Sequence, residues 1–189
     1  MYKRQVFSSS GADGDNCHAI CEVLASADRQ ISPTRFHNSV HNAPAGYWSI
    51  ATGAMAPSTS LCAYDGSFGA GLLEALCQVL ASRNPVLLIA YDTGYPEPLH
   101  RARPIADAFG IALLLSPERG EPTLSRVDVE LTAAAADVIA DPPLEALRTS
   151  YPAARGLPLL MALARGQPRR QVLDYLDHLR LAVTTTPCR

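Results

Sequence analysis

The sequence predicts a layered α/β fold, and three features of the residue pattern support this prediction. The clearest helix runs from Gly66 to Arg83, where apolar residues recur along one face at helical spacing. The stretch that follows, Pro85–Tyr91, is apolar throughout, as in a central strand that is covered on both faces. Strands and helices alternate along the chain as far as residue 117, which argues for helices packed against a sheet.

The elements expected before the central helix follow from residue type and from helix breakers. They are a strand at Gln5–Ser10, a helix capped by Asp13 or Asp15 and running to about Ala27, a loop at Ile31–Phe36, a helix capped by Asn38 and ended by Gly53, and a buried strand at Ser58–Ala63. Pro33 opposes a helix in the loop, and Pro44 is expected to kink or restart the helix that contains it.

The elements expected after the central strand are assigned in the same way. They are strands at Phe109–Leu115 and Ser125–Leu131, a connection at Ala133–Pro143, one or two helices within Leu144–Gly166, a strand at Gln171–Val183, and a tail at Thr184–Arg189. The helices are expected to break near Pro152 and Pro158. Apolar residues alternate in Gln171–Val183, which favours a strand over a helix there.

The composition is typical of a globular protein and excludes several functional classes. A chain of 189 residues with 48% hydrophobic and 18% charged residues is long enough for one domain with a real core. The net charge of −2 provides no electrostatic case for binding nucleic acid or an anionic membrane. No apolar run reaches the roughly 18–20 residues that span a bilayer, and no signal peptide is evident, so a cytoplasmic location is expected. Five cysteines without framework spacing are interpreted as buried free thiols.

One stretch, Ser32–Asp65 (SPTRFHNSVHNAPAGYWSIATGAMAPSTSLCAYD), resembles the amino-terminal half of β-ketoacyl synthases, thiolase-fold enzymes that condense acyl chains on carrier proteins. The residues that carry the resemblance are Ser32, Pro33, Asn42, Ala45, Gly46 and Ile50, followed by the strand at Ser58–Ala63. The resemblance implies a thiolase-like layered α/β fold in a single domain over residues 1–189. Residues 6–117 correspond to the ketosynthase amino half, and residues 118–189 to a reduced or truncated carboxy-terminal part.

The start of the chain raises a separate question. A whole ketosynthase amino half would begin well upstream of Val6, and residues 1–5 (MYKRQ) resemble a start derived from adapter sequence. We therefore treat residues 1–5 as an extension that need not be native, and we leave open whether the chain is a fragment.

The family's nucleophile is missing at the junction of strand and helix. In ketosynthases the strand ends at a catalytic cysteine, whereas here Ala63 is followed by Tyr64 and Asp65. Tyr64 is a poor acyl acceptor because it is bulky and a tyrosine hydroxyl has a pKa near 10. Asp65 suits a helix N-terminus on capping grounds alone. Cys62 is a candidate nucleophile only through a slip in register, and we prefer to interpret it as a packed strand cysteine.

The other groups of ketosynthase chemistry are missing too. The family also uses two histidines, or histidine and asparagine, and a lysine from its carboxy half, whereas beyond residue 117 this chain has only His178 and no lysine. The resemblance therefore implies a non-catalytic subunit similar to chain length factors of fatty-acid, aryl polyene and polyketide biosynthesis. Such a subunit would form a heterodimer with an active ketosynthase, meet the acyl carrier protein only indirectly, and need no cofactor.

The resemblance also implies which residues line the shared interface or its acyl tunnel. These are Phe36, His37, Asn38, His41, Asn42, Gly46, Tyr64 and Asp65.

Several alternatives remain open from the residues themselves. His37 and His41 are four residues apart, but a zinc site would need at least a third ligand, so no metal is expected. Asp92 ends a central strand, where a functional group and a simple turn are equally consistent with the pattern. Two other functional classes are a thiolase-like acyltransferase or hydrolase that uses Cys62 or Ser67, and a monomeric protein that binds an acyl chain or a carrier protein.

Overall fold

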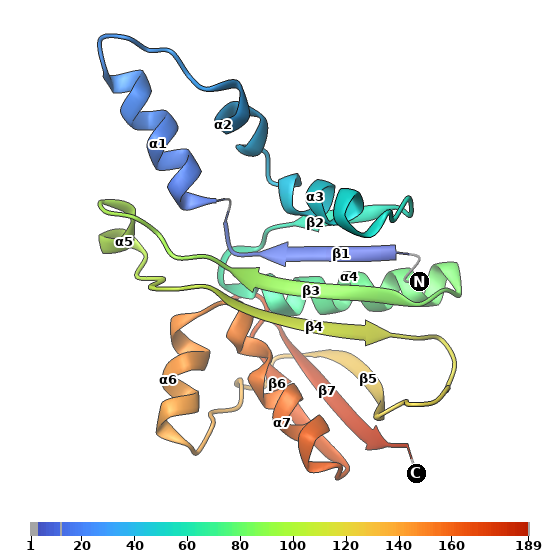
Figure 1. The fold of residues 1–189 in the computed structure, drawn as a ribbon. Helices are drawn as coiled ribbons and strands as arrows, with labels where there is room; N and C mark the ends of the chain where they lie inside the picture. The colour runs from blue at the N-terminus through green and yellow to red at the C-terminus, as the bar shows by residue number, and fades with distance from the viewer. Residues whose placement is uncertain (1–3, 12, 189) are drawn as a thin grey trace.

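The computed structural model describes residues 4–11 and 13–188 of the chain (Figure 1). Residues 1–3 of the proposed extension therefore lie outside the described residues, whereas Arg4 and Gln5 belong to the first strand. The elements in order are β1 (Arg4–Ser9), α1 (Gly14–Ala25), α2 (Pro33–Asn38), α3 (Ala43–Thr52), β2 (Ser58–Leu61), the 3-10 turn η1 (Tyr64–Gly66), α4 (Ser67–Ser82), β3 (Val86–Asp92), α5 (Leu99–Ala102), β4 (Phe109–Leu115), β5 (Ser125–Thr132), α6 (Pro142–Ser150), the 3-10 turn η2 (Ala153–Gly156), α7 (Leu157–Arg165), β6 (Arg169–Leu173) and β7 (Arg180–Pro187).

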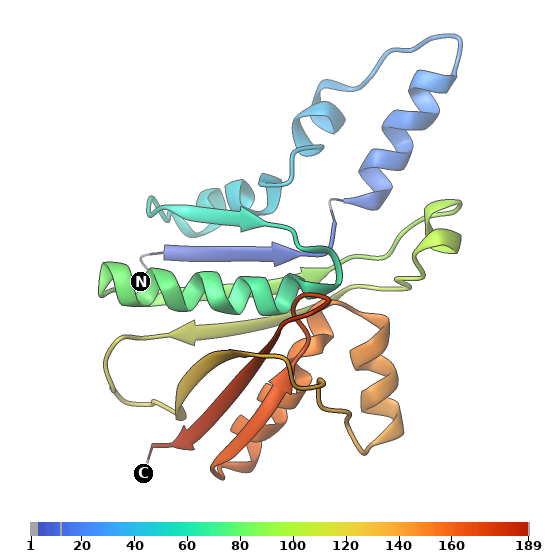
Figure 2. The same cartoon turned by 180° about the vertical axis from the view of Figure 1, so that it is seen from behind.

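Two sheets make up the strand framework. The first has the order β2-β1-β3-β4, with β1 parallel to both of its neighbours and β4 antiparallel to β3. The second has the order β5-β7-β6, with all pairs antiparallel. Helices α3 and α4 pack against the first sheet and α7 packs against the second, so the predicted α/β class is confirmed (Figures 1 and 2).

Helix α4 provides the centre of the core. Phe68 and Leu72 on its first two turns are fully buried, as is Leu88 on the adjacent strand β3. Leu173 and Leu181 of the second sheet join the same apolar cluster, so one core serves both sheets. The predicted apolar face of this helix is confirmed for Phe68 and Leu72, but Leu80, near the helix C-terminus, is exposed.

A buried carboxylate joins the first sheet to the segment of the chain after residue 150. Asp92, at the end of β3, accepts one hydrogen bond from the backbone N–H of Ser10 (3.1 Å) and one from that of Ala153 (2.7 Å). Turn η2, which contains Ala153, also contacts α4 and β4. The carboxylate of Asp92 therefore joins the ends of β1 and β3 to the segment after residue 150, a structural role that is neither of the two interpretations left open by the sequence.

The region of α2 and α3 differs from the sequence-based expectation. The predicted loop at Ile31–Phe36 is wrong, because Pro33 lies in the first turn of α2, where a proline is compatible with a helix and Ser32 caps it. The predicted cap Asn38 instead ends α2. Pro44 lies in the first turn of α3 and so requires no kink, whereas Gly53 ends that helix with a φ of 63°, as expected.

Two further expectations are wrong for reasons of tertiary contact. Strand β2 was expected to be buried, but it lies at the edge of its sheet and none of its four residues is buried. The single strand expected over Gln171–Val183 is a hairpin of β6 and β7, whose turn carries His178. The expected tail at Thr184–Arg189 belongs largely to β7, where Thr185 is fully buried; Arg189 lies outside the described residues.

None of the helices in the described part of the chain is both long and apolar enough to cross a membrane.

Substituting Gly156 by alanine is expected to lower the free energy of unfolding by about 1–3 kcal/mol. A Cβ atom at this position would overlap the ring of Phe68, which is fully buried. Urea denaturation of the variant would measure the loss. Gly120→Ala is the control, because a Cβ there meets no heavy atom within 4 Å; equal stability of the two variants would contradict the packing described here.

Candidate functional site

A sharp turn connects β2 to α4, and Tyr64 lies at its apex. The φ angle of Tyr64 is 50°, in the left-handed region that a bulky residue adopts only when the surrounding structure holds it there. Its side chain is 61% exposed. A strained residue between a strand and the N-terminus of a helix is the geometry of a nucleophile elbow, which presents one side chain to a substrate. The structure therefore assigns the elbow position to Tyr64.

An arginine covers the side chain at this position. The guanidinium carbon of Arg103, which follows α5, lies 3.7 Å from the centroid of the Tyr64 ring, a cation–π contact. Nη2 of the same arginine donates to Oδ1 of Asp65 at 2.8 Å. Burial alone would lower the pKa of Arg103, but the hydrogen bond and the charge of Asp65 outweigh it and raise that pKa. Arg103 is therefore a fixed cation at the elbow.

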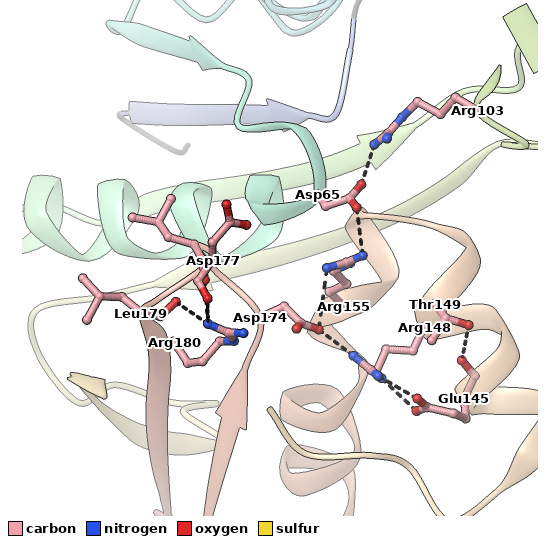
Figure 3. A network of polar contacts seen from close by, with 11 residues as sticks. Asp65, Arg103, Glu145, Arg148, Thr149, Arg155, Asp174, Asp177, Leu179 and Arg180 are labelled. Atoms are coloured by element: carbon pink, nitrogen blue, oxygen red, sulfur yellow. Dashed lines mark hydrogen bonds and ion pairs between the residues drawn. The ribbon is translucent and has the colours of Figure 1, made fainter. Parts of the chain in front are cut away.

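A chain of ion pairs continues from the elbow into the carboxy-terminal part of the protein (Figure 3). Nη2 of Arg155, in η2, donates to Oδ2 of Asp65 at 3.2 Å. Nη1 of the same arginine lies 3.9 Å from Oδ2 of Asp174. Arg148 of α6 donates to Asp174 at 2.6 Å and makes a bidentate pair with Glu145. With Arg103, the network contains three arginines and three carboxylates, so its formal charges cancel.

Arg148 and Glu145 form a pair with two hydrogen bonds within this network. The pKa of Glu145 lies at about 2, against an ordinary value of 4.5, mainly because Arg148 donates hydrogen bonds to the carboxylate. Burial opposes this shift, and the backbone N–H of Ile139, which donates to Oε2 at 2.9 Å, adds to it. The hydrogen bonds to Glu145 are also the main cause that raises the pKa of Arg148.

An open hollow of about 550 Å³ lies beside the elbow. Its lining comes from the elbow, from η2 and from the β6–β7 turn, and consists of Ala63, Tyr64, Asp65, Gly66, Arg155, Asp174, Tyr175, Leu176, Asp177, His178, Leu179 and Arg180. Nη1 of Arg180 donates to the carbonyls of Leu176 and Asp177 at 2.7 and 2.8 Å, which holds the turn closed. His178, the last histidine of the sequence, thus lies in a turn at the elbow rather than in an apolar strand.

The two candidate nucleophiles near the elbow differ in exposure. Ser67 is buried, and its hydroxyl accepts a hydrogen bond from Ala63 N (3.0 Å) and lies 2.7 Å from the Tyr64 carbonyl, so it serves to hold the turn. Cys62 is exposed rather than packed as expected, and Cys17, Cys21 and Cys77 are exposed too, so the prediction of buried thiols is wrong for these four cysteines. Its thiol donates to the carbonyl of Ser10 at 3.1 Å, and among the described residues this is its hydrogen-bond partner. No general base therefore contacts this thiol within the described chain.

The other predicted site residues lie on α2, on α3 and in the link between them. Phe36 and His37 of α2 are exposed, and Asn38 accepts a hydrogen bond from the hydroxyl of Tyr47 at 2.8 Å. Nε2 of His41 lies 3.0 Å from the carbonyl of Leu61, so the link between the helices contacts the end of β2. Asn42 precedes α3 and makes no side-chain cap, and Gly46 lies on the exposed surface of α3. Their role in an interface or tunnel stays a prediction.

Within residues 4–11 and 13–188, no three or more His, Cys, Asp or Glu side chains are placed to hold a metal ion. His37 and His41 therefore have no third ligand from the described part of the chain.

Sequence reasoning missed the arginines of the site. Arg103 and Arg155 are separated from Asp65 by 38 and 90 residues, so no local motif joins them. One signal was present, because residues 146–173 contain several arginines but neither Asp nor Glu. Buried arginines need carboxylate partners from elsewhere, and that composition indicates long-range ion pairs without showing which carboxylates form them.

Comparisons with known proteins identify the family and the fold of the chain. The family profile described as Beta-ketoacyl synthase, N-terminal domain, matches residues 2–170. The structure matches a chain of the solved complex of the ketosynthase ApeO with its chain length factor ApeC from Xenorhabdus doucetiae, with a TM-score of 0.74 and 24% sequence identity. That match covers 97% of this chain and 70% of the other. No curated protein matches this sequence significantly.

The fold is therefore the thiolase-like layered fold of ketosynthases, as the sequence predicted. The chain belongs to the β-ketoacyl synthase N-terminal domain family.

Replacing Glu145 by glutamine is expected to lower the free energy of unfolding at neutral pH. It should also make that free energy depend less on pH in the acidic range. The folded-state pKa of Glu145 lies below its ordinary value, so its contribution is present above about pH 4.5 and is lost as the pH falls through about 2. Urea denaturation between pH 7 and pH 2 would show the two proteins converging at low pH. Glu118→Gln, in an exposed loop, removes the same charge as a control; a constant difference between wild type and Glu145→Gln at all pH values would contradict the assignment.

Proposed function

We propose that this chain is a non-catalytic, ketosynthase-like subunit of the chain-length-factor type that pairs with an active β-ketoacyl synthase. The observation that carries the proposal is the elbow, where Tyr64 replaces a nucleophile and Arg103 covers its ring. The next side chain, Asp65, is held between two arginines. An elbow whose side chain is an unreactive tyrosine, covered by an arginine, is more consistent with a structural role than with acyl transfer.

The chemistry of acyl transfer supports this interpretation. A cysteine at the N-terminus of a helix is activated because the helix dipole and its free N–H groups stabilise the thiolate. Tyr64 is bulky, and a tyrosine hydroxyl is protonated at neutral pH. The carboxylate of Asp65 would repel the oxyanion that acyl transfer generates beside the same helix. The chain therefore keeps the scaffold of the reaction without the group that performs it.

The surface around α3 is the proposed site of pairing. Helix α3 contains no charged residue, and a helix that is apolar on all sides is usually buried. Yet Ala45 is the buried residue of this helix, while Ile50 is 80% exposed. Large exposed apolar side chains extend onto the neighbouring segments and form the α2–α3 surface, which consists of Phe36, Val40, Tyr47, Ile50 and Met55.

Strand β2 lies beside α3 and adds an unpaired backbone edge to this surface (Figure 1). An edge strand presents N–H and C=O groups that another chain is able to pair, and proteins usually protect such edges. β2 carries no charged residue that would discourage pairing. An apolar helix and an open strand edge in one place support a protein partner rather than exposure to water.

The likeness to a chain of a complex between a ketosynthase and its chain length factor supports a ketosynthase as that partner. In this proposal Phe36, His37, Asn38, His41, Asn42 and Gly46 contribute to the interface or to the acyl tunnel, with Tyr64 and Asp65 near the tunnel. The acyl carrier protein would be met through the ketosynthase. The pathway would be one of fatty-acid, aryl polyene or polyketide biosynthesis.

Co-expression with an active ketosynthase from the same source, followed by size exclusion with light scattering, tests the proposal. We expect a stable one-to-one complex, and a chain that self-associates when it is expressed alone. If the chain is a soluble monomer that forms no complex with the ketosynthase, the pairing role is wrong.

Replacing Gly46 by arginine is expected to weaken that complex at least tenfold while leaving the isolated chain folded. A Cβ at Gly46 meets no heavy atom within 4 Å, so a long side chain is accommodated in this chain but projects into the proposed interface. Gly120→Arg is the matched control, because its Cβ also meets no atom and it lies in the β4–β5 loop. Affinity for the ketosynthase would be measured by light scattering across a dilution series. Equal affinity of both variants would show that the interface does not include Gly46.

The exposed thiol of Cys62 supports one alternative, a thiolase-like acyltransferase that uses this cysteine. We expect that a cerulenin-type or acyl-thioester probe will modify Cys62 no faster than the exposed Cys77, because no described base contacts Cys62. Peptide mass spectrometry would compare adducts at Cys62 with those at Cys77, which serves as the internal control. Selective, stoichiometric modification of Cys62 would favour the enzyme.

A further inference from the structure

Two of the exposed cysteines lie on the same face of helix α1. Cys17 and Cys21 are four residues apart in this helix, so their side chains are neighbours separated by one turn. Both residues are exposed. Helix α1 extends away from the two sheets, so the pair is open to a ligand and lies apart from the elbow (Figure 1).

The two thiols influence each other. The pKa of Cys17 is raised above its ordinary value, first by partial burial and then by the neighbouring Cys21 thiol. The second cause means that two thiolates at these positions would repel each other. The thiolate is the form of cysteine that binds metals, and a cation bound between two thiolates removes their repulsion.

The first turn of α1 is fixed by three contacts, which hold the pair in place. The side chain of Asp13 accepts from Asn16 N at 3.0 Å and caps the helix. A Cβ on Gly14 would overlap the ring of Tyr95, so the start of the helix packs closely on that ring. The amide of Asn16 donates to the carbonyl of Arg35 in α2 at 2.8 Å.

The side of α1 that contacts α2 is not the side that carries the thiols. With 3.6 residues per turn, Cys17 and Cys21 are rotated by about 100° and about 140° around the helix axis from Asn16. Asn16 is the residue of this helix that binds α2. The thiols therefore lie off the α2–α3 surface, which is assigned above to a protein partner.

The charges near the pair favour a cation. From Asp13 to Asp28 the sequence contains four carboxylates but neither lysine nor arginine. The charge of Asp13 reaches the thiol of Cys17 and adds to the rise of its pKa. A surface with one sign of charge raises the local concentration of ions of the opposite sign.

The number of ligands determines which metal fits. Thiolates select soft metals such as Cu(I), zinc and the iron of iron–sulfur clusters. Structural zinc sites and iron–sulfur clusters use four protein ligands. In the part of the chain that the structure describes, no three His, Cys, Asp or Glu side chains are grouped to hold a metal. Cu(I) differs because two thiolates in a linear arrangement complete its coordination.

A disulfide between the same residues fits the helix less well. Side chains one turn apart have Cβ atoms about 5–6 Å from each other. A disulfide requires a Cβ separation of about 3.5–4.5 Å, so it would distort α1. Two metal–sulfur bonds in sequence span the longer distance and leave the helix intact.

We propose that Cys17 and Cys21 bind one Cu(I) ion as a two-coordinate dithiolate. Two S–Cu bonds form, the two thiol protons pass to solvent, and the oxidation state of the metal does not change. Helix α1 supplies both ligands, so the proposal does not rest on pairing with a ketosynthase. Absence of a complex in light scattering and absence of metal binding are therefore separate results.

Anaerobic titration of the reduced 189-residue chain with Cu(I), in competition with bicinchoninate, tests the proposal. We expect one tightly bound equivalent in the wild type and in Cys77→Ser, which removes an exposed cysteine of α4 as a matched control. Cys17→Ser and Cys21→Ser should each lower the affinity about a hundredfold, because the second thiolate binds at a high effective concentration. Undiminished affinity in either variant would overturn the site.

Two further measurements belong to the same titration. Equimolar Zn²⁺ should not displace Cu(I), and displacement would show that the site has more than two ligands, contrary to the proposal. Urea denaturation should give both serine variants the wild-type midpoint, because both cysteines are exposed. Loss of affinity accompanied by unfolding in both variants would contradict a role confined to the metal.

A double variant separates the spacing of the thiols from their number. Ala19→Cys combined with Cys21→Ser keeps two cysteines in α1 but places them two residues apart, where side chains do not face each other. This variant should bind Cu(I) as weakly as Cys21→Ser alone. Wild-type affinity in the double variant would show that helical spacing is irrelevant and would contradict the proposed geometry.

Alkylation with iodoacetamide, followed by peptide mass spectrometry, locates the bound metal. One equivalent of Cu(I) should protect Cys17 and Cys21 and leave the exposed Cys62 and Cys77 reactive. Equal protection of all four cysteines would indicate an adventitious ion only and would overturn the site.

Discussion

The carboxylate of Asp65, held between Arg103 and Arg155, is the interaction on which the rest of the site depends. Asp65 immediately follows the strained residue of the elbow, and its two partners come from the segment after α5 and from η2. The pairs are only partly buried, so their Coulomb energy is modest and their main effect is geometric. They connect turn η1, immediately before α4, to residues far along the chain, so the conformation of the elbow depends on the whole domain.

In the non-catalytic role that we propose, the same arrangement explains how the scaffold of the family is kept. A left-handed bulky residue at an elbow costs of order 1 kcal/mol or more, which an enzyme tolerates because the exposed side chain reacts. Here the cation–π contact with Arg103 stabilises the exposed ring instead. Close packing of Gly66 and Gly69 against Asp174 and Tyr175 holds the start of the helix in place. Packing and ion pairs thus hold the elbow in place with Tyr64 at its apex.

Only part of the candidate site was open to prediction from the sequence. The elbow could be located because strand, turn and helix are consecutive, and Tyr64 with Asp65 replace the expected cysteine pattern. The arginines around Asp65 could not, because their pairing depends on how separate segments fold together over 38 and 90 residues.

The sequence by itself determined the elements whose signal is local: the amphipathic helix α4, the apolar strand β3, and the Ser32–Asp65 stretch that indicates the family. Tertiary structure decided what local patterns cannot express. Whether β2 lies inside a sheet or at its edge depends on which strands flank it, and the alternation in Gln171–Val183 does not reveal that Asp174–Leu179 turns back as a hairpin. Burial and ion pairing are properties of neighbours in space, and those neighbours are assigned only when the chain has folded.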